Sequence, residues 1–101
     1  MKNEIHPVKA RVWLWQGESP GAWHFATIEK DQANVIKKSY HWPRRGFGSI
    51  PVNVTVGNTT WKTSIFPEKE GTYVLPLKKA VRDIENIKLG QTINLTIEVL
   101  N

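Results

Sequence analysis

A two-residue turn near the middle of the chain fixes how the segments on either side of it pair. The turn is Gly57-Asn58, where glycine can take the positive φ angle that a tight β-hairpin requires. One face of the hairpin pairs Val56 with Thr59, Val54 with Trp61, Val52 with Thr63 and Ile50 with Ile65. The opposite face is polar and pairs Thr55 with Thr60 and Asn53 with Lys62. A slip of one residue would invert both faces, so the sequence predicts this register and places Trp61 in the core.

Four other segments have the pattern of β-strands. Residues 8–16 alternate between Val8, Ala10, Val12 and Leu14 on one face and Lys9, Arg11, Trp13 and Trp15 on the other. The aromatic-rich residues 22–28 follow a turn signal at 18–21 and are expected to pair with them as a hairpin. Residues 72–75 predict a short strand and residues 91–101 a final one, whose inward side chains are Ile93, Leu95, Ile97 and Val99.

The outward face of the first strand allows two interpretations. Trp13 and Trp15 are either buried beneath a helix packed on the outside of the sheet, or they form an exposed aromatic platform. Because tryptophan is above all a large apolar side chain, burial is the expected state.

Two segments have helical spacing. Residues 29–39 carry acids at the start and Lys37 and Lys38 at the end, an order that suits the helix dipole. The second helix is expected to begin at Pro76, a residue tolerated in the first turn of a helix. Its predicted apolar side is Leu77, Ala80, Val81, Ile84 and Ile87. The element order β-β-α-β-β-β-α-β predicts a mainly β fold, a small closed antiparallel β-barrel of about six strands with two short helices, in one domain over residues 1–101.

Composition narrows the functional classes. The 101 residues include no cysteine, which excludes disulfides and thiolate metal sites and suits a cytoplasmic location. The sequence shows neither a signal peptide nor a membrane-spanning stretch, so no membrane partner is expected. A net charge of +5 favours anionic partners, although many soluble domains carry this charge for solubility alone.

Basic residues at two places suggest an anion site. Arg44-Arg45 precede Gly46 and Gly48, a pair expected to mark a bend in a barrel strand. The second helix carries its charges against the dipole, with Lys78 and Lys79 at its start, Asp83 and Glu85 near its end, and Arg82 on the face of Lys78. If both clusters face one cleft, Arg44, Arg45, Lys78 and Arg82 converge on a carboxylate, a phosphate or a nucleic-acid backbone. Alternatively, Lys79–Asp83 and Arg82–Glu85 pairs offset the unfavourable order.

Catalytic patterns are weak. The histidines, His6, His24 and His41, are far apart and have no metal-ligand spacing, so neither a metal nor a cofactor is expected. His24 is interpreted as an ordinary strand residue, and Ser49 and Ser64 lack a nucleophile elbow. Tyr73 is expected in the core or at the rim of a cleft, where its hydroxyl could contact a ligand. Enzyme activity is therefore the least favoured interpretation.

Several ordered motifs resemble a known family over nearly the whole chain. They are Trp23-His24-Phe25, Arg45-Gly46-Phe47-Gly48-Ser49, Val54-Thr55-Val56-Gly57, Trp61-Lys62-Thr63-Ser64-Ile65-Phe66-Pro67, Tyr73-Val74-Leu75-Pro76-Leu77-Lys78 and Gly90-Gln91-Thr92-Ile93. In these motifs the chain is similar to the bacterial domain of unknown function numbered nineteen hundred and five. The resemblance implies a small β-barrel, found alone or fused to a bacteriocin-protection-type domain. It implies no established activity, so no catalytic residue is assigned.

Three functions remain open. The first is a non-catalytic binding module for a small anionic or polar ligand, with candidate ligand-binding residues Arg44, Arg45, Thr63, Ser64, Tyr73, Lys78 and Arg82. The second is nucleic-acid binding through a basic face with aromatic platforms at Trp13 and Trp15. The third is a protein-interaction or oligomerisation module.

Overall fold

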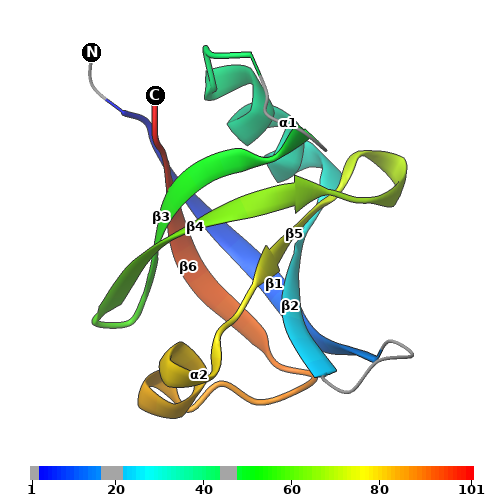
Figure 1. Cartoon of the computed structure of the whole chain (residues 1–101), viewed down its shortest axis with the longest axis vertical. Coiled ribbons are helices and arrows are strands. Elements are labelled where there is room, and N and C mark those ends of the chain that lie inside the picture. Colours follow the sequence, from blue (N-terminus) through cyan, green and yellow to red (C-terminus); the bar gives the residue numbers. More distant parts are fainter. Residues whose placement is uncertain (1–2, 17–21, 44–47) are drawn as a thin grey trace.

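Six antiparallel strands close into a barrel in the computed structural model, which describes residues 3–16, 22–43 and 48–101 (Figure 1). The strands are β1 (Ile5–Gln16), β2 (Ala22–Ile28), β3 (Ile50–Val56), β4 (Thr59–Pro67), β5 (Tyr73–Pro76) and β6 (Thr92–Val99). Around the barrel their order is β1-β2-β5-β4-β3-β6, so β1 and β6, the first and last strands, are neighbours. The predicted fold class is confirmed.

The central hairpin has the predicted register. Val54 pairs with Trp61 and Asn53 with Lys62 across β3 and β4, and Gly57 in the turn has a φ of 57°. Trp61 is only 8% exposed, which confirms its predicted place in the core.

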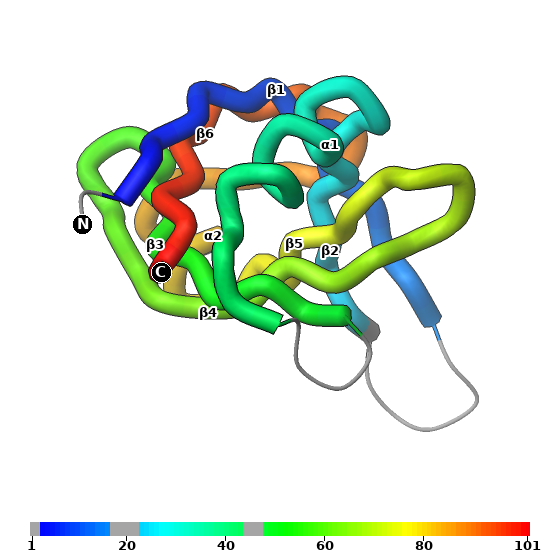
Figure 2. Tube along the Cα trace, turned by 90° about the horizontal axis from the view of Figure 1, so that it is seen from above, coloured from blue at the N-terminus to red at the C-terminus, as the bar shows by residue number. Residues whose placement is uncertain are grey.

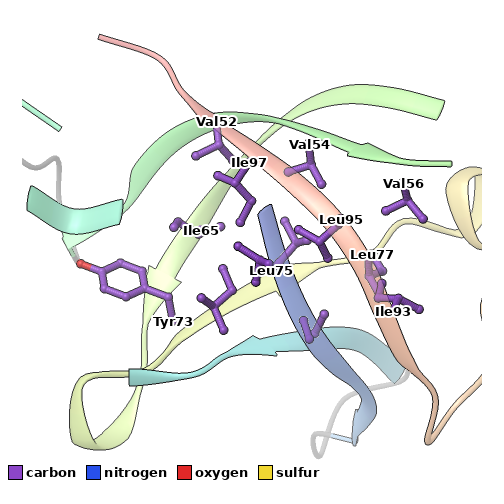
Figure 3. Packing of buried hydrophobic residues seen from close by; sticks show 14 of the residues in the cluster. Val52, Val54, Val56, Ile65, Tyr73, Leu75, Leu77, Ile93, Leu95 and Ile97 are labelled. Carbon is purple, nitrogen blue, oxygen red and sulfur yellow. The ribbon is translucent and has the colours of Figure 1, made fainter. Parts of the chain in front are cut away.

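Aliphatic side chains from all six strands fill the barrel (Figure 3). Those with no exposed surface include Ile28, Ile50, Ile65, Leu75 and Ile97. They alternate along each strand with outward residues, as the two-residue period of a strand requires. Because the interior is packed with side chains, the barrel wall offers its outer surface to ligands.

The two helices lie at opposite ends of the barrel (Figure 1). Helix α1 (Lys30–Ser39) lies over one end, seen from above in Figure 2, and contributes Ala33 and Ile36 to the core. Helix α2 (Lys79–Glu85) lies at the other end and contributes Val81. A single 3-10 turn, η2 (Lys69–Gly71), separates β4 from β5. None of the helices in the described part of the chain has the length and apolar character needed to cross a membrane.

The second helix is shorter than predicted. Pro76 is the last residue of β5 and not the first of a helix, because the Leu77 N–H still donates to the His24 carbonyl of β2 at 2.9 Å. The helix ends at Glu85, after which Asn86 takes a left-handed conformation with a φ of 55°. Of the predicted apolar side, Leu77, Val81 and Ile87 are buried, whereas Ala80 and Ile84 are exposed. Leu77 precedes the helix and Ile87 follows it, so Val81 is the one residue of this set that α2 itself buries.

Candidate functional site

Aromatic side chains gather on the outside of β1, β2, β5 and β4. We call this surface the tryptophan face; its residues are Trp13, Trp15, Trp23, Phe25, Phe66, Val74 and Pro76. Trp15 is 48% exposed, Trp23 57% and Phe66 37%. The expectation that the Trp13–Trp15 face would be buried beneath a helix is therefore wrong. Both helices close the ends of the barrel, and no described element covers this side.

Strand pairing brings the rings together. Trp13 lies opposite Phe25 and Trp15 opposite Trp23 in the β1–β2 ladder. The Trp13 and Phe25 centroids are 5.3 Å apart, and the Trp23 ring lies 6.4 Å from Phe25 and nearly parallel to it, at 12°. The Trp13 indole N–H donates to the Thr27 hydroxyl at 2.7 Å, which fixes that ring on the barrel wall. The rings thus form one continuous apolar surface, and Trp15 and Trp23 leave about half of their surface in water.

Two adjoining grooves cross this surface. The first has a volume of about 380 Å³ and runs among the aromatic rings of β1 and β2, with Glu68 at its end. The second has a volume of about 740 Å³ and reaches over β4 towards Pro51 and Leu100. Trp23, Phe66 and Pro76 line both grooves. The grooves are therefore two parts of one elongated site.

The second groove follows a seam where β4 and β5 separate. The two strands pair only at Phe66–Val74 and Pro67–Tyr73. The same register would next place Ser64 opposite Pro76, on the side of β5 that faces β4, but proline has no N–H to donate to the Ser64 carbonyl. Pro76 thus ends the ladder, and the chain beyond it turns into α2. Beyond Pro76, β4 and β5 are therefore not hydrogen-bonded to each other, although the six strands together close the barrel.

Polar side chains border the seam. Lys62 is exposed, and Thr63 and Ser64 are half-buried, all three on β4. Among the residues that the structure describes, these three side chains make no hydrogen bond or ion pair. The Lys62 ammonium group and the Ser64 hydroxyl are therefore available on the outward face beside the aromatic rings, as donors to a polar or anionic ligand. Thr63 lines the same groove from the alternate face of β4, the side of Trp61 and Ile65.

Charge is distributed unevenly over the barrel. The four strands under the tryptophan face carry Lys9, Arg11 and Lys62, and their sequences contain no aspartate or glutamate. The acids occupy other elements, as Asp31 on α1 and Glu98 on β6 do. Lys62 lines the second groove and Arg11 lies two residues before Trp13 on β1, whereas Glu68 is the one charged side chain among the described residues that lines the first groove. The two cations favour an anionic ligand beside the rings.

The predicted site residues fall in three places. Thr63 and Ser64 lie in the second groove, as described above. Tyr73 is buried in the core, where Figure 3 shows its ring. Lys78 is exposed at the N-cap position of α2. Arg44 and Arg45 lie outside the described residues, as does Gly46.

Arg82 has partners within the fold. Its Nε donates to the Leu77 carbonyl at 3.0 Å, and its Nη1 lies 3.3 Å from Nε2 of His24. These contacts join α2 to β2 and to the residue that follows β5. The predicted Lys79–Asp83 pair is present at 2.6 Å. The predicted Arg82–Glu85 pair is not formed, because Arg82 points towards His24 and Glu85 instead accepts a hydrogen bond from the Thr59 hydroxyl at 2.6 Å.

His24 is held in its neutral form. Desolvation, and secondly the positive charge of Arg82, lower its pKa below the ordinary value of 6.5. When Arg82 donates to Nε2, the ring proton must reside on Nδ1, a buried atom without a partner in the described part of the chain. This histidine belongs to the packing between β2 and α2. Within residues 3–16, 22–43 and 48–101, no three histidine, aspartate or glutamate side chains come together to hold a metal ion.

Sequence reasoning missed part of the tryptophan face. Trp23 and Phe25 share the outward face of β2, and the hairpin places them beside Trp15 and Trp13. Their alternation with His24 was the signal that could have identified them. Phe66 and Pro76 could not be found in this way, because their proximity to Trp23 depends on how the barrel closes.

Comparison with known proteins identifies one family. The family model described as Domain of unknown function (DUF1905) matches residues 9–97, which confirms the resemblance seen in the motifs. No curated protein matches the chain.

Proposed function

The chain belongs to the DUF1905 family, whose role is unknown, and we propose that this domain is a binding module that holds a ligand on the tryptophan face. The ligand has flat rings and polar or anionic edges. Its rings stack on Trp15, Trp23 and Phe66, while its polar edge meets Lys62 and the hydroxyls of β4.

One observation carries this proposal: large aromatic side chains stay in water where the fold does not need them. The core is complete without Trp15, Trp23 and Phe66, because their strands turn other residues inward. A contiguous apolar patch of this kind on a small protein marks a binding surface. A single exposed residue such as Ile84, which lines neither groove, carries no such meaning, because scattered apolar residues are common on protein surfaces.

The site proposed here differs from a basic cleft at α2. Arg82 is already bound to the Leu77 carbonyl and His24, and Lys79 pairs with Asp83, so these cations have internal partners. Lys62, Thr63 and Ser64 lie in the groove itself. A small anionic or polar ligand would therefore bind on β4 and β5.

We propose a cytoplasmic setting, because a chain without cysteine suits a reducing compartment.

The five tryptophans provide a direct test, because each gives its own indole N–H signal in a proton–nitrogen NMR spectrum. Nucleoside monophosphates and simple sugars would be titrated one at a time. We expect the signals of Trp15 and Trp23 to move with at least one of these compounds. Trp61 is buried and Trp42, which is 63% exposed, lies outside both grooves, so these two signals should stay in place as internal controls.

The pattern of shifted signals distinguishes binding on the tryptophan face from binding at α2 and from self-association. Shifts confined to Lys78, Lys79 and their neighbours would move the binding site to α2 and contradict the proposal. Equal shifts at Trp42 and Trp23 would indicate nonspecific contact with exposed indoles. If no compound moves any indole signal and the protein self-associates through Trp23, the face is an oligomerisation surface instead.

A further inference from the structure

We infer that the natural ligand of this site is single-stranded nucleic acid, laid across the tryptophan face from β1 to β4. The inference rests on the proposed function and names its ligand. It commits to a polymer, with bases on the aromatic rings and phosphates beside the flanking cations. This combination of stacking surface and basic border is how proteins bind single strands without reading their sequence.

Cations flank the rings on both sides. Arg11 is on the outward face of β1, two residues before Trp13, and Lys62 is on the outward face of β4, beside Ser64. Two strands, β2 and β5, lie between them. Three strand spacings amount to about 14 Å across the sheet. The registers place Arg11 level with Phe66, four residues along β4 from Lys62, so the two cations are further apart still and a single phosphate cannot bridge them. A chain with several phosphates can reach both cations at once, and a mononucleotide cannot.

The aromatic surface requires unpaired bases. Stacking needs the flat face of a base, and in a duplex those faces are covered by neighbouring base pairs. Trp15 and Trp23 turn ring surface to solvent over about half of their area, being 48% and 57% exposed. The two grooves adjoin and remain open along the surface, so a strand can pass through without threading its ends.

The Ser64 hydroxyl fits the same ligand. It lies on the outward face of β4 and can donate to a phosphate oxygen or to a base edge, and neither contact depends on one particular base. The four strands contain no acid, which keeps repulsion low along them, and Glu68, which follows β4, is the one carboxylate among the described residues that lines either groove. The predicted binding is therefore tolerant of sequence and dependent on salt.

The first experiment measures binding of a fluorescein-labelled oligothymidylate of about 15 nucleotides by fluorescence anisotropy. Loss of one stacked base contact by Trp23→Ala should weaken binding about 5- to 150-fold. Trp23→Phe keeps a ring and should stay within about threefold of the parent protein. Trp42→Ala removes an equally exposed tryptophan outside the grooves and should leave the affinity unchanged. Circular dichroism and thermal unfolding of each variant verify the fold.

The second experiment measures the salt dependence. Each cation that neutralises a phosphate of a single strand adds about −0.7 to the slope of log affinity against log salt. Contacts by Arg11 and Lys62 would give a slope of about −1.4, or about sevenfold weaker binding at 200 than at 50 mM salt. Lys62→Ala should make the slope shallower by about 0.7. The matched control Lys38→Ala, on α1, should not change it.

These experiments distinguish failure of the nucleic-acid inference from failure of the proposed binding function. If mononucleotides or sugars move the Trp15 and Trp23 signals but neither oligothymidylate nor oligouridylate binds, the nucleic-acid inference is overturned and the binding site remains. Equal affinity for a duplex of the same length would also overturn it, because stacked bases cannot use the rings. Binding without a salt slope, or binding unaffected by Trp23→Ala, would contradict it as well.

Discussion

The inside and the outside of the same barrel wall differ in what their apolar side chains do. Inward residues such as Val54 and Ile97 have no exposed surface and hold the strands together. Outward residues such as Trp15 on β1 and Trp23 on β2 alternate with the inward residues of their own strands but leave about half of their surface in water. The inward side chains are thus needed for the barrel to fold, whereas the exposed rings of the tryptophan face are compatible with the fold but do not build its core. Apolar residues that the fold merely permits are the ones open to selection for binding.

The largest expected effect is the difference in unfolding free energy between replacing Trp61, on the inner side of the barrel wall, and replacing Trp23, on its outer side. Trp61→Ala would leave a cavity in the core and should lower the free energy of unfolding by about 3–5 kcal/mol. Trp23→Ala removes an exposed ring whose described aromatic contact is Phe25 and should cost about 1 kcal/mol or less. Urea unfolding of both variants measures the difference.

Trp61→Phe provides the control, because it refills most of the space and should recover much of the lost stability. Should Trp23→Ala cost as much as Trp61→Ala, the tryptophan face would be part of the structural core, and the distinction between the two sides would fail.

This contrast also explains what the sequence could predict. Alternation reports which side of a strand a residue occupies, so the register around Gly57-Asn58 and the burial of Trp61 followed from the sequence. Alternation does not report what covers that side. The exposure of Trp15 was mispredicted because the helices pack at the ends of the barrel, which depends on long-range closure.

The candidate site shows the same limit. Thr63 and Ser64 could be named from their motif, but the groove that contains them exists because β4 and β5 part at Pro76. The sequence predicts that this proline begins a helix, whereas it ends β5, because proline is compatible with both positions and only tertiary pairing distinguishes them. Arg82 looked like a ligand-binding cation, yet its hydrogen bonds point into the fold.

A smaller effect is expected at His24, which lies on β2 between two outward residues, Trp23 and Phe25. Its pKa is lowered in the folded protein by desolvation and by Arg82, so at mildly acidic pH the unfolded chain binds the proton more readily. Stability from this site is complete above the unfolded pKa of 6.5 and is lost as the pH falls through the folded pKa. Urea unfolding between pH 7 and about 5 should show this decline.

His24→Gln tests the assignment, since the glutamine amide oxygen can accept from Arg82 but does not titrate. The other two histidines, His6 and His41, are present in both proteins, so their effects cancel in the comparison. An identical pH dependence in the variant and the parent would show that His24 does not contribute to it.

The smallest effect on stability is expected for Pro76→Ala. This variant tests whether Pro76 causes the second groove by ending the pairing of β4 and β5. Alanine restores an N–H opposite the Ser64 carbonyl and would let the β4–β5 ladder continue. The new hydrogen bond would add about 1 kcal/mol, while the greater freedom of the unfolded chain would remove about 0.4–1 kcal/mol, so the net change should be near zero.

The diagnostic readout for this variant is therefore local. The new amide at position 76 should be protected from hydrogen exchange, and ligand binding at Lys62 and Thr63 should weaken because the seam has narrowed. Ser64→Ala, which keeps the backbone carbonyl and removes only the hydroxyl, separates loss of the groove from loss of a donor. An amide at position 76 that exchanges as fast as a loop would mean that another feature holds β4 and β5 apart, and Pro76 would lose its role in forming the site.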